Sequence, residues 1–291
     1  MPNAPILTLQ IEEQPTRLTL LAAPDLFIRF GLGLRLRVNG APVSWASSDL
    51  VLESTSSKEV DSPQGSFQTT ILRYKTPHPG LFLDLHAGLH PNRQLGLFKA
   101  DLINQSADAV AVNRIILLES QPGEIRLGTA AAAEPVFYGN GWQSWSPSNS
   151  YRLGEKQARS RLGFLANPMI QYTGTPITTE VNHFSSDMFA LVGDLGTNWG
   201  LTAGFLSQAE QFGSLECRLS AEPSLRMWAN GDGVTLDPGE SIATDWAACG
   251  FGLLTDPDPM RPYLTAVSRE NQVKKIESPP LGWCSWDHYF T

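Results

Sequence analysis

Cysteine is scarce in this chain of 291 residues, with Cys217, Cys249 and Cys284 far apart from one another. Three cysteines at such spacing match neither a disulfide framework nor the paired ligands of a zinc site. They predict reduced, mostly buried thiols, and we expect neither a metal site nor a cofactor. The N-terminus also lacks a basic stretch followed by a long apolar run, so we expect no signal peptide. Together these absences predict a cytoplasmic protein.

Charge is scarce as well: charged residues make up 17% of the chain, and the net charge is −8. No run of five basic residues occurs, although phosphate backbones are bound by clustered lysine and arginine. This balance argues against nucleic acid as a partner and is compatible with a neutral, polyhydroxylated ligand. No window approaches eighteen apolar residues, so we expect no membrane span.

Glycine and proline are plentiful, at 25 and 21 residues, and the hydrophobic pattern has a period of two from Thr16 to about Thr255. The clearest case is 34–38, where leucine and valine alternate with Arg35 and Arg37 before an Asn-Gly turn. Such a segment predicts a strand with one buried and one solvated face, followed by a hairpin. Many short strands with polar turns predict a mainly β fold, a large antiparallel β-sandwich.

Three segments depart from this alternation. The polar, serine-rich residues 49–64 predict an exposed loop, and residues 148–180 predict irregular excursions from the sandwich. Residues 257–273 have helical periodicity, with Asp256 or Asp258 available as an N-cap. We therefore expect one short linker helix after the last strand of the sandwich.

Two stretches stand out because they concentrate aromatic residues. GNGWQSWSP, at 139–147, has the composition of a loop yet contains Trp142 and Trp145. Large aromatic residues in a loop either fill the rim of the core or stack on a ligand, and the residues alone leave both open. PPLGWCSWDHYF, at 279–290, begins with helix-breaking prolines and continues as a buried strand.

The order of these two motifs, with SSDMFALVG and WGLTAGFLS between them, resembles the α-galactosidases of glycoside hydrolase family 36. The resemblance covers residues 138–291 well and residues 1–137 only in general character. It implies a β-sandwich followed by a (β/α)8 barrel with the active site at the C-terminal ends of the barrel strands. Accordingly we expect an N-terminal sandwich domain at 1–255, a linker helix at 256–278 and the first barrel strand at 279–291. A barrel needs about 250 residues, so the chain is expected to hold a truncated barrel.

The resemblance also implies which residues contact substrate. Trp145 matches the tryptophan that walls the galactose site, whereas Trp142 is expected to anchor the loop itself. Trp283 and Trp286 match tryptophans of the first barrel strand, and Asp287 at its end can accept hydrogen bonds from sugar hydroxyls. The two carboxylates of retaining hydrolysis are carried by later barrel strands in the family, so we assign no catalytic residue here and expect this fragment alone to be inactive.

Several alternatives stay open at this point. One branch of the family has tyrosine at the position of Asp287, which leaves open hydrolase or galactosyl transferase, and α-galactose or α-N-acetylgalactosamine. The other class of function is a non-catalytic carbohydrate-binding or structural β-sandwich. The expected partner is an oligosaccharide with terminal α-linked galactose, and the sequence leaves the oligomeric state open, homo-oligomers included.

Overall fold

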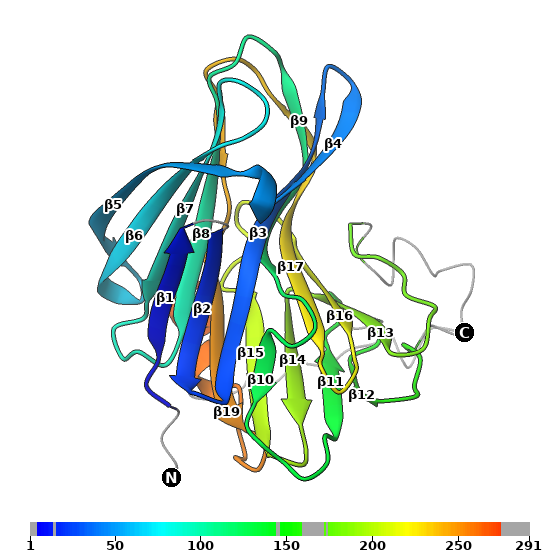
Figure 1. Cartoon of the computed structure of the whole chain (residues 1–291). Coiled ribbons are helices and arrows are strands. Elements are labelled where there is room, and N and C mark those ends of the chain that lie inside the picture. The colour runs from blue at the N-terminus through cyan, green and yellow to red at the C-terminus, as the bar shows by residue number, and fades with distance from the viewer. Residues whose placement is uncertain (1–4, 14–15, 144–145, 159–171, 173, 275–291) are drawn as a thin grey trace, which may run out of the picture.

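The structure is a computed structural model that describes residues 5–13, 16–143, 146–158, 172 and 174–274. Among these residues it is mainly β, with two large antiparallel sheets and one short α-helix. Figure 1 shows the two sheets packed face to face along the long axis of the molecule. The predicted antiparallel β-sandwich is therefore confirmed.

The first sheet has nine strands, in the order β1-β2-β3-β9-β17-β16-β13, with β4 and β10 also paired to β3. Their bounds are β1 Thr8–Glu13, β2 Thr16–Ala23, β3 Leu26–Val38, β4 Ala41–Ala46, β9 Val110–Glu119, β10 Ile125–Leu127, β13 His183–Asp187, β16 Gly213–Arg218 and β17 Ser224–Leu236.

The second sheet has ten strands, in the order β12-β11-β14-β15-β19-β8-β7-β6-β5, with β18 paired to β8. Their bounds are β5 Val51–Ser62, β6 Gly65–Lys75, β7 Leu81–Leu89, β8 Gly96–Asn104, β11 Pro135–Gly139, β12 Asn149–Arg152, β14 Phe189–Asp194, β15 Trp199–Phe205, β18 Ser241–Ala243 and β19 Ala247–Leu253.

The predicted hairpin after residue 38 is present. β3 pairs with β4, and Asn39 and Gly40 form the turn with φ of 52° and 78°. Both turn residues have positive φ, which is the geometry that a two-residue hairpin turn requires and that an Asn-Gly pair adopts readily. Leu34 and Leu36 are buried whereas Arg37 is exposed, as the alternation predicts.

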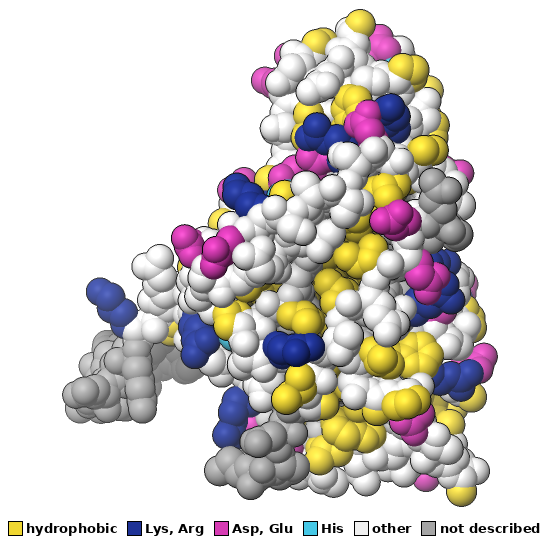
Figure 2. Space-filling model, turned by 60° about the vertical axis from the view of Figure 1, so that its left-hand side comes forward, with side chains coloured by type: hydrophobic (Ala, Val, Ile, Leu, Met, Phe, Trp, Pro, Cys, Tyr) yellow, Lys and Arg dark blue, Asp and Glu magenta, His cyan; other side chains and the backbone are white. Residues whose placement is uncertain are grey.

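The prediction of an exposed loop at 49–64 is wrong, because most of this segment is β5. β5 is an edge strand whose backbone pairs with β6 over its whole length, from Val51 with Lys75 to Ser62 with Gly65. Nearly all of its side chains are exposed, so the strand carries no apolar alternation to reveal it. Polar and charged side chains at a sheet edge also discourage pairing with another chain. Figure 2 shows this side of the molecule, where acidic and basic side chains are interspersed.

The predicted helix is present but shorter than expected. α1 spans Arg261–Glu270, and its N-cap is Met260, which makes no side-chain capping bond. Asp256 instead accepts the backbone N–H of Asp258 in the turn before the helix. The predicted aspartate cap is therefore wrong, because the chain makes this extra turn before helical geometry begins. α1 packs on the second sheet, where the Tyr263 hydroxyl donates to the Phe205 carbonyl at 2.6 Å.

The sandwich is held together by apolar side chains between its sheets. Phe30 of β3 and Phe98 of β8 are fully buried and meet edge to face with their ring centroids 5.1 Å apart. Such a contact combines the burial of two large apolar side chains with a favourable ring geometry. It joins β3 of the first sheet to β8 of the second.

Replacing Phe98 with alanine is expected to lower the free energy of unfolding by about 3–5 kcal/mol, because it removes a buried ring and leaves a cavity. Chemical denaturation measures this loss. Val234→Ala is the control, because Val234 is 50% exposed and its truncation is expected to cost less than about 0.5 kcal/mol. Equal effects for the two variants would contradict this placement of the core.

Candidate functional site

The aromatic motif forms a hairpin loop at an edge of the second sheet. Strands β11 and β12 pair antiparallel with Gly139 opposite Asn149, so residues 140–148 join them. We call residues 140–148 the aromatic loop. Trp142 is 40% exposed, and Trp145 lies outside the described residues. The other sequence-predicted substrate residues, Trp283, Trp286 and Asp287, also lie outside them, as does the proposed barrel strand at 279–291.

The aromatic loop closes tightly on itself. The N–H of Gly141 donates to the Ser148 hydroxyl at 2.9 Å, and the N–H of Ser146 donates to the Gln143 carbonyl at 3.0 Å. A Cβ atom on Gly141 would collide with Ser146, so this approach requires glycine. The close approach of Ser146 thus explains why position 141 of the motif is glycine.

The base of the loop is bonded to the end of β13. Asn140 accepts the N–H of Asp187 at 2.9 Å, and its own N–H donates to the Ser186 hydroxyl at 2.7 Å. The next bond is made by a side chain, because the N–H of Trp142 donates to Oδ2 of Asp187 at 3.2 Å. Trp142 is therefore fixed through its backbone while its ring stays partly exposed.

The other oxygen of the same carboxylate binds a different segment. Oδ1 of Asp187 accepts the Thr175 hydroxyl at 2.6 Å, and the Thr175 and Ser214 hydroxyls lie 2.6 Å apart. Asn230 donates from Nδ2 to Ser214 at 2.7 Å and accepts the indole N–H of Trp228 at 3.0 Å. A chain of hydrogen bonds thus runs from Asp187 across β16 to β17.

Residues 174–178 cover the outer face of these strands, and we call them the strap. Arg114 of β9 donates to the Gly174 carbonyl at 3.2 Å, and its guanidinium lies 4.5 Å from the ring centre of Trp228. A Cβ atom on Gly174 would collide with the Asn230 side chain, so the strap approaches the sheet closely. Trp228 is completely buried.

Two aromatic rings, those of Phe212 and Tyr172, lie beside the loop. Trp142 meets Phe212 edge to face with the ring centroids 6.5 Å apart, and Tyr172 stacks on Phe212 with the ring centroids 3.9 Å apart. The Tyr172 hydroxyl donates to Asp232 on β17. Phe212 therefore supports both neighbours, and the exposed part of Trp142 is presented from a fixed base. An aromatic face of this kind can stack on the apolar C–H face of a sugar.

Burial sets the electrostatics of the site. Asp187 is 3% exposed, and desolvation raises the pKa of its carboxyl to about 6. Hydrogen bonds from Thr175 and from the backbone of Trp142 and Tyr172 act in the opposite direction and offset part of this rise. The pKa of the Tyr172 hydroxyl is raised by burial and by Asp232. Because both oxygens of Asp187 are engaged within the chain, this carboxylate suits a structural role better than nucleophilic attack.

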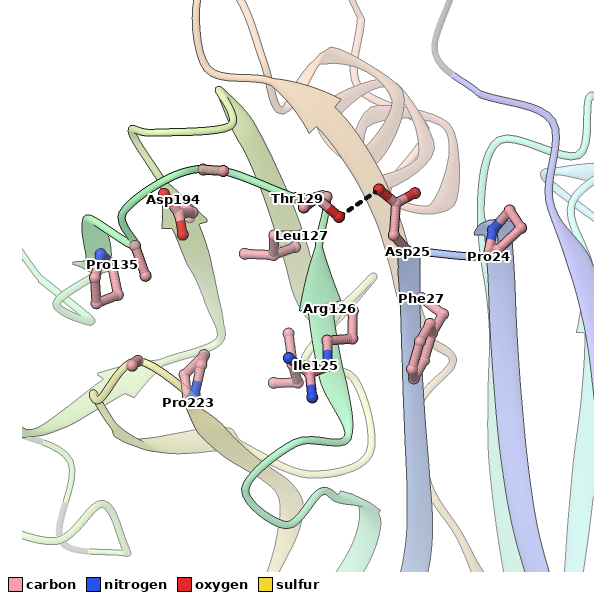
Figure 3. Close-up of a pocket in the computed structure, with 15 residues that line it drawn as sticks. Pro24, Asp25, Phe27, Ile125, Arg126, Leu127, Thr129, Pro135, Asp194 and Pro223 are labelled. Atoms are coloured by element: carbon pink, nitrogen blue, oxygen red, sulfur yellow. Dashed lines mark hydrogen bonds between the residues drawn. The ribbon is translucent and has the colours of Figure 1, made fainter.

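A cavity of about 390 Å³ lies elsewhere, beside β10 (Figure 3). Its charged groups are bonded within the chain. Asp25 accepts the Thr129 hydroxyl at 3.0 Å, Arg126 pairs with Glu222 at 3.1 Å, and Asp194 accepts the N–H of Gly196 at 2.8 Å. These groups hold the surrounding turns, so the cavity is a weaker candidate than the aromatic loop.

The described part of the chain contains no cluster of three or more histidine, cysteine or acidic residues that could hold a metal. Within the same residues, no helix is long and apolar enough to cross a membrane. Cys217 and Cys249 are buried and unpaired, and burial raises the pKa of Cys249 to about 12, so its thiol is unreactive at neutral pH.

Comparison with known proteins gives structural similarity without sequence similarity. No protein-family model matches the chain, and no curated protein matches it. The galactosidase domain of the α-galactosidase–sucrose kinase AgaSK superposes with a TM-score of 0.51 at 11% identity, over 76% of this chain and 30% of its own. An α-galactosidase from Lactobacillus brevis gives a TM-score of 0.50 at 14% identity, over 87% of this chain and 34% of its own.

These two similarities show a fold like that of a region of the two α-galactosidase structures. The chain spans about a third of the length of either solved structure. At such identities the likeness concerns the fold alone.

The residues that sequence reasoning missed are those that hold the loop in place. Asp187 sits inside SSDMF, as the last residue of β13, a short strand that the sequence did not predict. Thr175 lies in the segment predicted as irregular excursion. The one available signal was an acidic residue directly before the apolar segment 188–192, and that pattern does not identify its hydrogen-bond partners.

The pKa of Asp187 gives a testable dependence of stability on pH. The folded-state pKa of about 6 lies above the ordinary value of 3.8, so the folded state binds more protons between these values. The contribution of this group to the free energy of unfolding is therefore fully present at low pH and is lost as pH rises through about 6. Two pKa units correspond to roughly 3 kcal/mol. Asp187→Asn removes this pH-dependent contribution. Between pH 4 and pH 7 the free energy of unfolding of the variant is therefore expected to rise, relative to that of wild type, by up to roughly 3 kcal/mol.

Urea denaturation of both proteins at several pH values measures this difference. Asp84→Asn is the matched control, because Asp84 is also buried but forms a bidentate pair with Arg73. A constant difference between Asp187→Asn and wild type across this pH range would contradict the assignment.

Proposed function

We propose that the chain is the β-sandwich region of an α-galactosidase-type retaining glycoside hydrolase that acts on terminal α-linked galactose in oligosaccharides. The observation that carries the proposal is the aromatic loop, a hairpin loop whose described residues are hydrogen-bonded to one another and to β13, and which presents the partly exposed Trp142 at the edge of a sandwich. The fold similarity to two α-galactosidase structures supports the same reading.

In this proposal the sandwich supplies one wall of the sugar site. Trp145 stacks on the galactose ring, and Trp286, Asp287 and Trp283 contribute from the first barrel strand. The two catalytic carboxylates belong to later barrel strands, because retaining hydrolysis needs a nucleophile and an acid/base about 5 Å apart. No cofactor takes part, since protonation of the leaving group and attack on the sugar require only carboxyl groups.

A second candidate is a carbohydrate-binding module without catalysis. The specific observation in its favour is that the described sandwich has its own core and that Trp142 is exposed beside Phe212. Such a module would bind an α-galactoside through stacking alone. The two candidates differ in what the purified 291-residue chain does by itself.

Turnover of an aryl α-galactoside separates them, combined with calorimetric titration of a galactose-terminated oligosaccharide. The hydrolase proposal predicts no turnover and weak or absent binding by this chain alone, with turnover by the protein that carries it together with a barrel. Tight binding by the chain alone, lost in Trp142→Ala, would favour the module. Turnover by the chain alone would contradict the assignment of catalysis to barrel strands outside it.

Trp145→Ala in the hydrolase is expected to raise KM for an aryl α-galactoside by about tenfold, because a stacking contact of this kind contributes on the order of 1 kcal/mol or more. The melting temperature is expected to change little. Trp45→Ala is the control, since Trp45 lies on β4, well away from the aromatic loop (Figure 1). That variant is expected to lower the melting temperature without changing KM. A Trp145 variant with unchanged kinetics and a large loss of stability would instead place this residue in the core.

A further inference from the structure

Two segments that are distant in sequence meet at one buried carboxylate. The Trp142 N–H reaches Asp187 across 45 positions, and the Thr175 hydroxyl reaches it across 12. The first bond belongs to the aromatic loop and the second to the strap. Each takes a different oxygen of Asp187, so the carboxylate bridges them.

The position of Asp187 explains why it can do this. β13 belongs to the first sheet and β14 to the second, so the chain changes sheets directly after Asp187. Met188 makes the corner with a φ of 68°, which is unusual for a residue with a side chain. The carboxylate is therefore carried by a corner that both sheets hold in place.

A carboxylate is also the side chain that this position needs. Its described partners are donors: a backbone N–H, a threonine hydroxyl and the backbone of Tyr172. An ionised carboxylate only accepts, so it can satisfy all of them at once. Burying it without a cationic partner is costly, and no basic side chain is among the partners described for it. A group that is costly to bury, placed at the base of the aromatic loop, indicates a role beyond packing.

The strap is in turn fixed to the sheet. Thr175 contacts Ser214, whose hydroxyl accepts from Asn230, and Asn230 also donates to the Phe212 carbonyl at 2.8 Å. At the other end of the strap, Thr178 donates to Oε1 of Gln157 at 2.5 Å. Movement of the strap would break several of these bonds together.

We propose that Asp187 is a positioning residue that locks the aromatic loop to the strap, so that the two segments hold one conformation together. Its consequence for sugar binding rests on the proposed function. Loss of the carboxylate would free the backbone of Trp142, and the loop that carries both tryptophans would no longer be presented in a single orientation.

Hydrogen–deuterium exchange of the 291-residue chain tests the lock without reference to any activity. Asp187→Ala is expected to speed amide exchange about tenfold or more in both residues 140–148 and 174–178, while β19 stays protected. Asp187→Asn is expected to restore most of the protection, because its carbonyl can accept from Trp142 and its amide can donate to Thr175. Asp84→Ala is the control and is expected to leave both segments unchanged.

Two outcomes would overturn the proposal: unchanged protection of both segments in Asp187→Ala, or faster exchange throughout the chain, β19 included. If that variant does not fold, Thr175→Val removes one arm of the bridge. It is expected to loosen the aromatic loop as well as the strap, and protection of the loop in this variant would contradict the coupling.

In the hydrolase, Asp187→Ala is expected to raise KM for an aryl α-galactoside about tenfold with kcat changed less than about twofold, and Asp187→Asn to restore KM. An unchanged KM in Asp187→Ala would overturn the positioning role. A wild-type protein without turnover would contradict the proposed function alone, because the exchange measurement still decides whether the lock exists.

Discussion

The acceptance of hydrogen bonds by one buried carboxylate is the interaction on which the candidate site depends. Asp187 stands where the chain passes from one sheet to the other, and it binds a loop on one side and a strap on the other. Without the Asp187 carboxylate, the Trp142 N–H would lose the hydrogen-bond acceptor described for it. The orientation of the aromatic motif is thus a property of the sandwich corner as well as of the loop.

The energetics of this arrangement depend on the core beneath it. Desolvation raises the pKa of Asp187 to about 6, so its hydrogen bonds do not fully offset the cost of burying its charge. Hydrogen bonds to a charged group contribute about 1.5–3 kcal/mol each, and the penalty is of the same order. The hydrogen bonds and the desolvation penalty of Asp187 therefore nearly cancel, and the net stability of the fold must come from other contacts. Contacts between the sheets, such as that of Phe30 with Phe98, supply it through apolar burial.

The two parts of the fold differ in how far sequence could predict them. The hairpin at Asn39 and the sandwich follow from alternation and turn chemistry, which are local signals. β5 was missed because an exposed edge strand is specified by backbone pairing to β6 and has no apolar face. The helix was found, but its start was placed too early because the turn formed by Asp256 and Asp258 resembles a cap in sequence.

The candidate site follows the same division. The tryptophan-rich loop was visible as a composition that loops rarely have, and its glycine has the geometric role expected of that residue. Asp187, Thr175 and Asn230 were not visible, because a lone polar residue gives no sign of a partner many positions away. Only the three-dimensional arrangement of β13, β16, β17 and the strap brings these side chains to the base of the loop.

The central claim is that this sandwich presents tryptophans to an α-galactoside. Its most direct test is the set of indole N–H resonances of the ¹⁵N-labelled protein that carries this chain together with a barrel, recorded with and without a galactose-terminated oligosaccharide. The account predicts that the resonances of Trp142 and Trp145 shift while that of buried Trp228 does not. Shifts confined to Trp199, at the start of β15, or to Trp246, directly before β19, would contradict it.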